Sequence, residues 1–270
     1  MARAILKRAA LPALRIPKVP RLPDPNEPDV FDEMTLQEHL EELRSRIVKT
    51  CISIGIAFIG GVVLAGPVLR QIVDKAKADQ SGLDIGSPTD PIAIYFRIAL
   101  YIAIAITAPI IMWHLIGFLA PGLTKKEKRV LFSSLPFVSL LFLSGVAYAF
   151  FFAAPRAFEF LSGFQSDIFS WDPDGSEVIN FYLTLMIGLG LSFQIPIVMF
   201  LLAKLGIVSA RRMSDYRRYA AIALLVVSAV ITPSTDPINM AFVAFPLLLL
   251  YEIGLLAAKF LARPKPSVAA

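Results

Sequence analysis

The chain has 270 residues, of which 56% are hydrophobic and only 17% are charged, and its mean hydropathy is +0.68. Soluble domains carry about 25% charged residues, so this composition excludes both an ordinary water-soluble globule and a disordered chain. The net charge of +5 would suit nucleic acid, but basic residues in short loops between apolar spans set membrane orientation instead. We therefore expect no nucleic-acid partner. One cysteine and two histidines exclude a disulfide framework and predict no metal site and no cofactor.

The first 33 residues are basic and rich in proline, and they lack an apolar core followed by a small-residue cleavage site. Proline removes a backbone donor and charge resists burial, so we expect a disordered cytoplasmic tail over residues 1–33. A short second tail is expected over residues 262–270. The membrane domain is expected between them, over residues 34–261.

Six apolar runs in this domain predict six membrane helices, since a spanning helix needs about 20 mostly apolar residues. The fifth run has only about fourteen, so we expect local bilayer thinning or burial by neighbouring helices there. A re-entrant hairpin formed by the last two runs is the alternative. The expected spans are residues 47–66, 92–119, 130–153, 178–202, 219–232 and 238–261.

Lysine and arginine are concentrated in alternate segments outside these spans. The N-terminal segment, the second and fourth connections and the C-terminal tail are basic, whereas the other connections are poor in basic residues. The positive-inside rule then places both termini in the cytoplasm, and the alternation supports six spans. The fold predicted is an all-α integral membrane protein with six transmembrane helices. A bacterial, archaeal or thylakoid membrane is possible, and the composition of the chain best fits a bacterial plasma membrane.

An acidic helix is predicted ahead of the first span, over residues 35–44. Thr35 and Glu38 have capping-box spacing, and leucines recur at every third or fourth position. Glu38, Glu41 and Glu42 fall opposite those leucines. A solvated helix face would explain them, but carboxylates beside an anionic leaflet are repelled by it, so a cationic partner explains them better.

A second carboxylate lies in the connection after the second span, residues 118–129, which contains a Pro-Gly turn. Thr124 and Glu127 again have capping-box spacing, so the third helix is expected to begin there. Glu127 is either a capping group or a receptor for a guanidinium. Arginine forms planar bidentate pairs with carboxylates that lysine cannot reproduce, so two acidic sites could recognise a pair of adjacent arginines.

Polar residues also occur at membrane depth. Gln194 precedes Pro196 by two residues in the fourth span, and proline in a helix removes a backbone donor and predicts a kink. Gln194 either forms a helix–helix hydrogen bond or lies in a concave pocket that receives another protein's helix. Asp236, four residues after Thr232, is either a cap of the sixth helix or part of that pocket.

Several short motifs, each weak alone, occur in an order and spacing that resembles the TatC family of the twin-arginine protein translocase over residues 34–261. They are HLEELR at 39–44 with Pro67 after the first span, FLAPGL at 118–123, KEKR at 126–129, FQIP at 193–196, GIVS at 206–209, Thr232-Pro233 with Asp236, and YEIG at 251–254.

The resemblance implies a concave wall of six helices. It also implies a non-enzymatic receptor, without catalytic residues, for signal peptides of folded proteins that carry two adjacent arginines. Glu42 and Glu127 would bind the arginines. Supporting peptide-binding residues would be His39, Leu40, Glu41, Arg44, Phe118 and Lys126, and the concave, partner-binding pocket would comprise Pro67, Gln194, Pro196, Thr232, Asp236 and Asn239.

The resemblance further implies single-span TatA- and TatB-type partners along the fifth and sixth helices, folded cargo, membrane lipid and further copies of the chain. Transport would use the proton-motive force without a nucleotide. In two places the sequence departs from the family. Gln194 occupies a position that is often glutamate, which removes a titratable group, and Ile94-Tyr95 replaces a frequent Thr-Pro pair.

Two other function classes fit less well. A small-molecule secondary transporter would need ionisable residues deep in several spans, and this sequence has almost none. A membrane-embedded enzyme would need a converging aspartate pair, a serine–histidine pair or a metal triad at bilayer depth, and none is evident.

Overall fold

The computed structural model describes residues 36–76, 83–119, 125–165, 167–168, 171, 173–232 and 236–260. The predicted tails at 1–33 and 262–270 lie outside the described residues. Within the described part the chain is helical, and an isolated parallel bridge between Asp84 and Asp174 is its only β pairing. The predicted all-α class is therefore confirmed.

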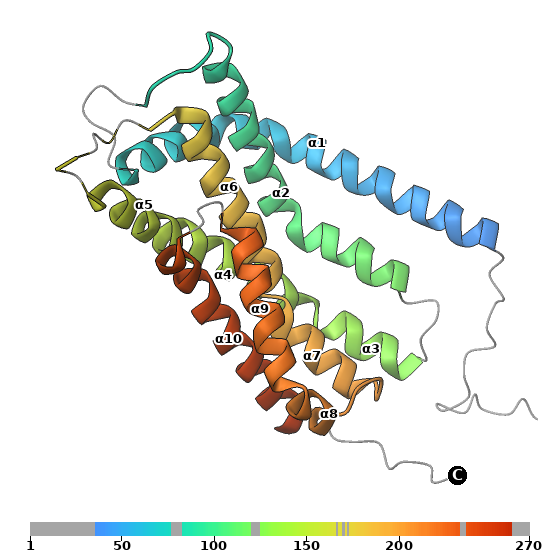
Figure 1. Ribbon diagram of the computed structural model, residues 1–270. Helices are drawn as coiled ribbons and strands as arrows, with labels where there is room; N and C mark the ends of the chain where they lie inside the picture. The colour runs from blue at the N-terminus through green and yellow to red at the C-terminus, as the bar shows by residue number, and fades with distance from the viewer. Residues whose placement is uncertain are drawn as a thin grey trace, which may run out of the picture.

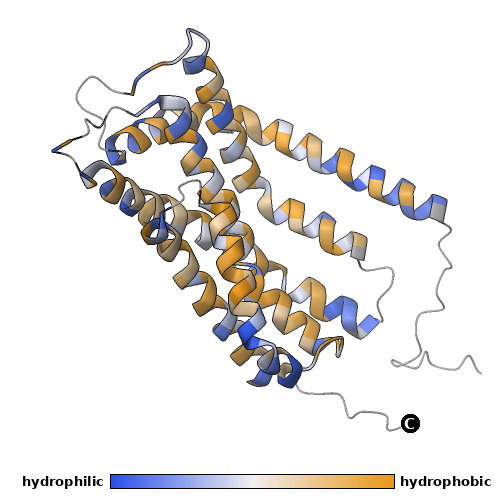
Figure 2. Cartoon of the chain, viewed as in Figure 1, coloured by the Kyte–Doolittle hydropathy of each residue, from blue (hydrophilic) through white to orange (hydrophobic). Residues whose placement is uncertain are grey.

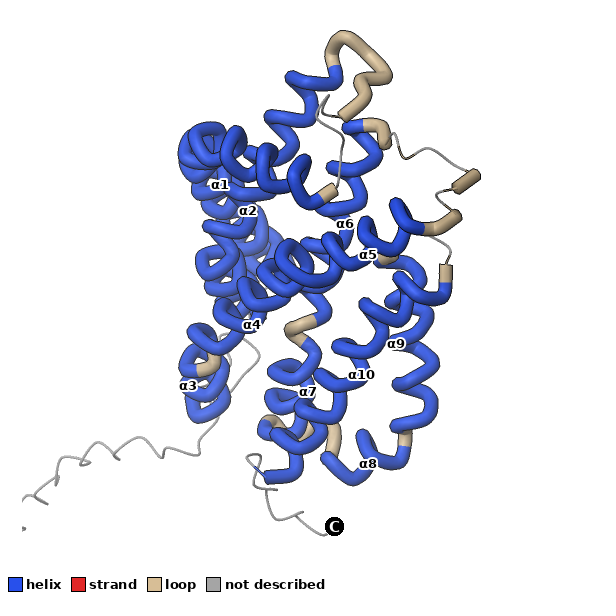
Figure 3. The backbone as a smooth tube through the Cα atoms, turned by 90° about the vertical axis from the view of Figure 1, so that its left-hand side faces the viewer, coloured by secondary structure: helices blue, strands red, loops and turns tan. Residues whose placement is uncertain are grey.

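Helices α1 and α2 lie side by side at one edge of the molecule, α9 and α10 lie at the other, and α4 and α6 lie between them (Figures 1 and 3). The elements are α1 (Leu36–Lys75), α2 (Asp90–Leu119), α3 (Lys125–Ser133), α4 (Leu135–Tyr148), the π-helix η2 (Ala149–Ala153), α5 (Ala154–Gly163), α6 (Gly175–Ser192), α7 (Ile195–Lys204), α8 (Ala210–Asp215), α9 (Arg217–Ile231) and α10 (Pro237–Phe260).

Five helical stretches among the described residues are long and apolar enough to cross a membrane, and they match five of the six predicted spans, two of which were predicted to end one residue later. Figure 2 shows apolar residues along the helices and hydrophilic residues gathered toward their ends. Helix α9, with 15 residues, matches the short fifth run but falls below the length of a spanning helix. Six spans are therefore not confirmed. The five stretches are Gln37–Lys75, Asp90–Phe118, Glu127–Gly163, Gly175–Lys204 and Pro237–Phe260.

The third and fourth of these stretches are each broken near a proline. Pro136 lies in the first turn of α4, just after the break at Ser134, and Pro196 lies in the first turn of α7. Proline lacks the N–H that would continue the preceding helix, and its ring clashes with the carbonyl four residues earlier. The kink predicted at Pro196 is thus confirmed as a break between α6 and α7.

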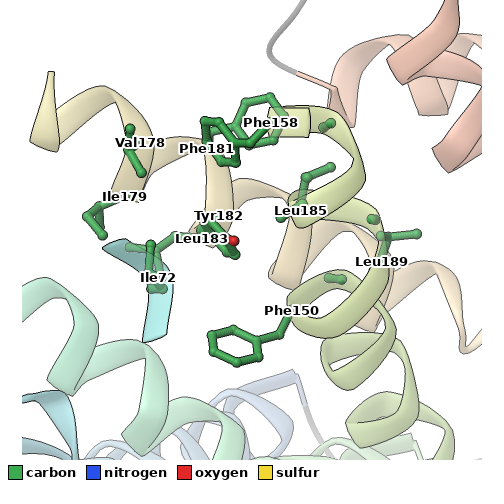
Figure 4. Close-up of a cluster of buried hydrophobic side chains, with 14 of the residues drawn as sticks. Ile72, Phe150, Phe158, Val178, Ile179, Phe181, Tyr182, Leu183, Leu185 and Leu189 are labelled. Carbon is green, nitrogen blue, oxygen red and sulfur yellow. The ribbon is translucent and has the colours of Figure 1, made fainter. Parts of the chain in front are cut away.

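The largest cluster of buried side chains lies where α1 ends and α6 begins (Figure 4). Tyr182 is fully buried there and stacks on Phe158, with ring centroids 5.4 Å apart. Ile72 and Ile179 pack in the same cluster with 0% exposure. The main apolar core therefore lies at the end of the molecule opposite the beginning of α1.

Helices α1 and α2 cross closely because small residues face each other. Gly61 is buried, and a Cβ atom added to it would meet the backbone of Ala99, with the carbonyl carbon at 3.1 Å. The Tyr95 hydroxyl donates a hydrogen bond of 2.7 Å to the Val62 carbonyl beside the crossing. Small residues let helix backbones approach closely in membranes. This crossing holds the beginning of α1 beside the end of α2.

Candidate functional site

The first turns of α1 present three polar side chains toward the end of α2. His39, Glu42 and Arg46 are spaced by three and four residues, which places them on one helix face. The His39 ring stacks on Phe118 of α2, with centroids 4.4 Å apart and planes 21° apart. Arg46 Nε donates to Glu42 Oε1 at 2.9 Å, and Arg46 Nη2 donates to the same oxygen at 2.5 Å.

Glu42 differs from its acidic neighbour in the same helix. The Glu42 side chain is 21% exposed, whereas Glu41 is 73% exposed and pairs with Arg44 at 3.7 Å. Glu42 Oε2 is buried and has no hydrogen-bond partner among the described residues. The sequence predicted one acidic face, but the structure divides it: Glu38 and Glu41 are exposed, while Glu42 faces inward beside Arg46.

Arg46 was not among the predicted site residues, although its spacing of four from Glu42 is a recognised ion-pair signal. Its guanidinium lies against the backbone of Gly117 in α2. A Cβ atom added to Gly117 would lie 2.8 Å from Arg46 Cζ and 3.0 Å from Nη2. Glycine at this position therefore leaves the space that the guanidinium fills.

Glu127 lies in the first turn of α3 and is half-buried. The predicted capping box cannot be followed to Thr124, because residues 120–124 lie outside the described residues. Trp113 of α2 and Phe132 of α3 are in ring contact, with centroids 5.0 Å apart. The beginning of α1, the end of α2 and the beginning of α3 lie at the same end of the molecule (Figure 1), so Glu42 and Glu127 share that end.

The remaining predicted peptide-binding residues surround this arrangement. Leu40 is 62% exposed, and Arg44 is exposed together with its partner Glu41. The side chain of Lys126 lies outside the described part of the chain. The structure thus brings His39 into contact with Phe118 and Glu42 into contact with Arg46, and it leaves Leu40, Glu41 and Arg44 exposed.

Gln194 joins two helices. Its Nε2 atom donates a hydrogen bond of 3.1 Å to the Val138 carbonyl of α4, whereas Oε1 is buried and without a hydrogen-bond partner among the described residues. The sequence allowed Gln194 either a helix–helix hydrogen bond or a place in a pocket for another protein's helix, and the structure contains the hydrogen bond. Pro196 lines a hollow of about 510 Å³ between α3–α4 and α7, with Phe137 and Phe200 also in its wall.

Three other predicted pocket residues lie at the hairpin between α9 and α10. The Thr232 hydroxyl donates to the Ser228 carbonyl at 2.7 Å. Asp236 accepts hydrogen bonds from the backbone N–H and from Nδ2 of Asn239, at 2.7 and 2.9 Å, so it caps α10.

The remaining predicted pocket residue, Pro67, is exposed within α1. Of the six predicted pocket residues, Pro196 alone lines the described hollow beside α7.

A second hollow, of about 440 Å³, lies among α1, α2, α4, η2 and α6. Its wall is apolar and includes Val68, Ile102, Leu143, Phe150 and Met186. Side chains from five helical elements thus surround one recess within the apolar part of the protein.

Comparisons with known proteins agree with this geometry. The family described as Sec-independent protein translocase protein (TatC) matches residues 38–246. The TatCy protein of Bacillus subtilis (strain 168) is 35% identical over 229 residues, which cover 84% of this chain and 90% of that protein. The chloroplastic TATC protein of Arabidopsis thaliana is 32% identical over 249 residues, covering 92% and 71%.

A crystal structure of the twin arginine translocase receptor TatC in DDM superposes with a TM-score of 0.72 at 31% identity. The superposition covers 84% of this chain and 100% of that chain. A second crystal structure of TatC gives a TM-score of 0.70. The chain therefore belongs to the TatC family of Sec-independent protein translocase proteins.

Proposed function

We propose that this chain is the receptor subunit of a Sec-independent translocase and that it binds signal peptides carrying two adjacent arginines. The observation that carries the proposal is the Glu42 carboxylate, which already accepts two hydrogen bonds from a guanidinium, that of Arg46. TatC proteins are translocase components and not enzymes, which also leaves a small-molecule transporter without support.

Two carboxylates would divide the recognition of the two arginines. Glu42 on α1 and Glu127 on α3 would each pair with one guanidinium, whose planar fork fits a carboxylate better than an ammonium does. The stacked rings of His39 and Phe118 would provide a rigid platform beside Glu42. Supporting contacts would come from the residues predicted around them: Leu40, Glu41, Arg44 and Lys126.

The proposed membrane arrangement has six spans, with α9 as the fifth, and both termini in the cytoplasm of a plasma membrane. Helix α9 exposes Ile222, Val226 and Val230, as a lipid- or protein-facing helix would. At 1.5 Å per residue its 15 residues span about 22 Å, short of a hydrocarbon core of about 30 Å. Thinning of the bilayer at α9 would make up the difference.

Single-span TatA- and TatB-type subunits are proposed to pack along α9 and α10, with folded proteins as cargo and lipid and further copies of the chain around them. The partner-binding residues proposed are Gln194, Pro196, Pro67, Asp236, Thr232 and Asn239. Transport would be driven by the proton-motive force. Because Gln194 cannot titrate, it would contribute hydrogen bonding and no proton transfer.

The test is equilibrium binding of a labelled Arg-Arg signal peptide, and of the same peptide with Lys-Lys, to the purified full chain in detergent. Hydrogen bonds to charged groups contribute about 1.5–3 kcal/mol, so Lys-Lys, Glu42→Gln and Glu127→Gln should each weaken binding roughly tenfold or more. Glu177→Gln is the matched control, because Glu177 is an exposed carboxylate at the opposite end, in the first turn of α6.

Tight binding of the Arg-Arg peptide that depends on both glutamates and is unaffected by Glu177→Gln would support the receptor function. Equal binding of the two peptides, with no effect of Glu42→Gln or Glu127→Gln, would overturn it.

A further inference from the structure

Neither oxygen of the Glu42 carboxylate is both exposed and without a hydrogen bond in the structure. Oε1 accepts two hydrogen bonds from Arg46, and Oε2 is buried without a hydrogen-bond partner in the described part of the chain. An incoming guanidinium therefore meets a carboxylate with one oxygen buried and the other already bonded to Arg46. A second arginine can form a bidentate pair with Glu42 only after Arg46 has moved away.

Arg46 is a group that can move away from Glu42. It lies on the same helix as Glu42, one turn further along, and its side chain is 24% exposed. Ion pairs at this spacing are weak on exposed helix surfaces, and partial burial strengthens them. A long arginine side chain can release the carboxylate and extend its charged end toward water.

Gly117 is what lets Arg46 occupy this place. A Cβ atom at position 117 would lie 2.8 Å from Arg46 Cζ, closer than ordinary van der Waals contact allows. The described contacts of the guanidinium thus come from two elements, the Glu42 carboxylate on α1 and the bare backbone of Gly117 on α2.

We propose that Arg46 is an intramolecular competitor for the signal peptide: it occupies Glu42 in the empty receptor and must leave before a peptide arginine can bind there. This inference rests on the proposed receptor function and adds to it a residue that sets the affinity. A residue that only oriented Glu42 would leave an oxygen for the peptide, whereas here Oε2 is buried and Oε1 is bonded to Arg46.

The competition predicts the direction and size of the effect. The apparent dissociation constant is the intrinsic one divided by the fraction of receptors whose site is open. If Arg46 leaves Glu42 open for roughly 10–30% of the time, removing the competitor tightens peptide binding about threefold to tenfold.

Two single variants test this by independent routes, with the full chain in detergent and the Arg-Arg peptide as probe. Arg46→Gln removes the competing guanidinium. Gly117→Ala keeps every charge but forces the guanidinium to shift from its place, and alanine is favourable in a helix. Each should bind the peptide about threefold to tenfold more tightly than wild type. The double variant should bind no more tightly than the stronger single variant, because both act on one competitor.

Arg211→Gln is the charge control, since Arg211 is an exposed arginine on α8. It should leave binding within about twofold of wild type, as surface changes away from a site do. Arg46→Lys is the further variant if Gly117→Ala does not fold. Lysine keeps the charge but lacks the planar fork, so it should compete less well and also tighten binding.

Unchanged or weaker binding in Arg46→Gln and Gly117→Ala, with Glu42→Gln still losing binding, would overturn the competitor and leave the receptor function standing. Tighter binding in Arg46→Gln that Arg211→Gln reproduces would also overturn it, as an effect of net charge. Failure of the receptor function itself has a separate signature, namely wild-type binding that ignores both Glu42→Gln and the Lys-Lys change.

Discussion

The close crossing of α1 and α2 predicts that alanine is tolerated at Gly60 but not at the adjacent Gly61. A Cβ atom at Gly61 would lie 3.1 Å from the Ala99 carbonyl carbon and 3.4 Å from its Cα, and closer still to its oxygen. A Cβ atom at Gly60 would have no neighbour within 4 Å among the described residues. Gly61→Ala must therefore push the two helices apart, whereas Gly60→Ala need not.

The difference between the two variants isolates the steric cost. Replacing glycine by alanine in a helix gains up to about 1 kcal/mol in helix propensity, and this gain is common to both positions. Overpacking of a tight contact costs about 1–3 kcal/mol. The free energy of unfolding of Gly61→Ala should therefore lie about 1–3 kcal/mol below that of Gly60→Ala. Separation would also strain the Tyr95–Val62 hydrogen bond of 2.7 Å beside the crossing.

The assay is titration of the detergent-solubilised chain with SDS, followed by the fluorescence of its two tryptophans, Trp113 and Trp171. Because α1 carries Glu42 and α2 carries Phe118, the Arg-Arg peptide should also bind less tightly to Gly61→Ala than to Gly60→Ala. Equal free energies of unfolding for the two variants would refute the close crossing.

The same titration tests two further contacts. Gln194→Glu, at a pH that ionises the new carboxyl, replaces the N–H donor that faces the Val138 carbonyl at 3.1 Å with an acceptor and should lower the free energy of unfolding by about 1–3 kcal/mol. At a pH where the carboxyl is protonated its O–H can donate to the same carbonyl and the loss should shrink, so wild-type stability at every pH would contradict this contact. Asp174→Ala removes the cap of α6, whose Oδ1 accepts from the backbone N of Ser176 at 2.8 Å and of Glu177 at 3.1 Å, and should cost about 0.5–2 kcal/mol. Asp174→Asn keeps an acceptor and should stay near wild type, so an equal loss in both variants would assign the effect to charge instead of capping.

Much of the helix pattern could be predicted because apolar runs and prolines act locally. Five of the six predicted spans fall in helices long enough to cross a membrane, and the break before Pro196 lies where the missing N–H places it. The short sequence motifs likewise pointed to the TatC family, which the comparisons confirm. The number of membrane spans could not be fixed in the same way. Helix α9 has only 15 residues, so whether it crosses the membrane depends on the thickness of the bilayer and on the helices around it.

The hydrogen-bond partners of the predicted pocket residues could not be predicted from the sequence. Gln194, Thr232 and Asp236 were correctly identified as polar groups near helix breaks or ends, but their partners could not be named from spacing alone. The structure gives Gln194 the Val138 carbonyl, 56 residues away, and makes Asp236 a cap of α10. A hydrogen bond between distant helices depends on how those helices pack, which residue spacing does not encode.

The sequence by itself determined that the chain forms apolar helices, where prolines interrupt them, and which carboxylates lie ahead of the first and third spans. These properties depend on composition and on the helical period of 3.6 residues, which are local. Only the tertiary structure decided that Glu41 stays exposed while Glu42 is mostly buried beside Arg46, and that Gly61, but not Gly60, lies against Ala99 at the helix crossing. Two adjacent residues of the same type cannot be told apart by composition. They differ in burial and contacts because they lie on different faces of the helix and the neighbouring helix packs against only one of those faces.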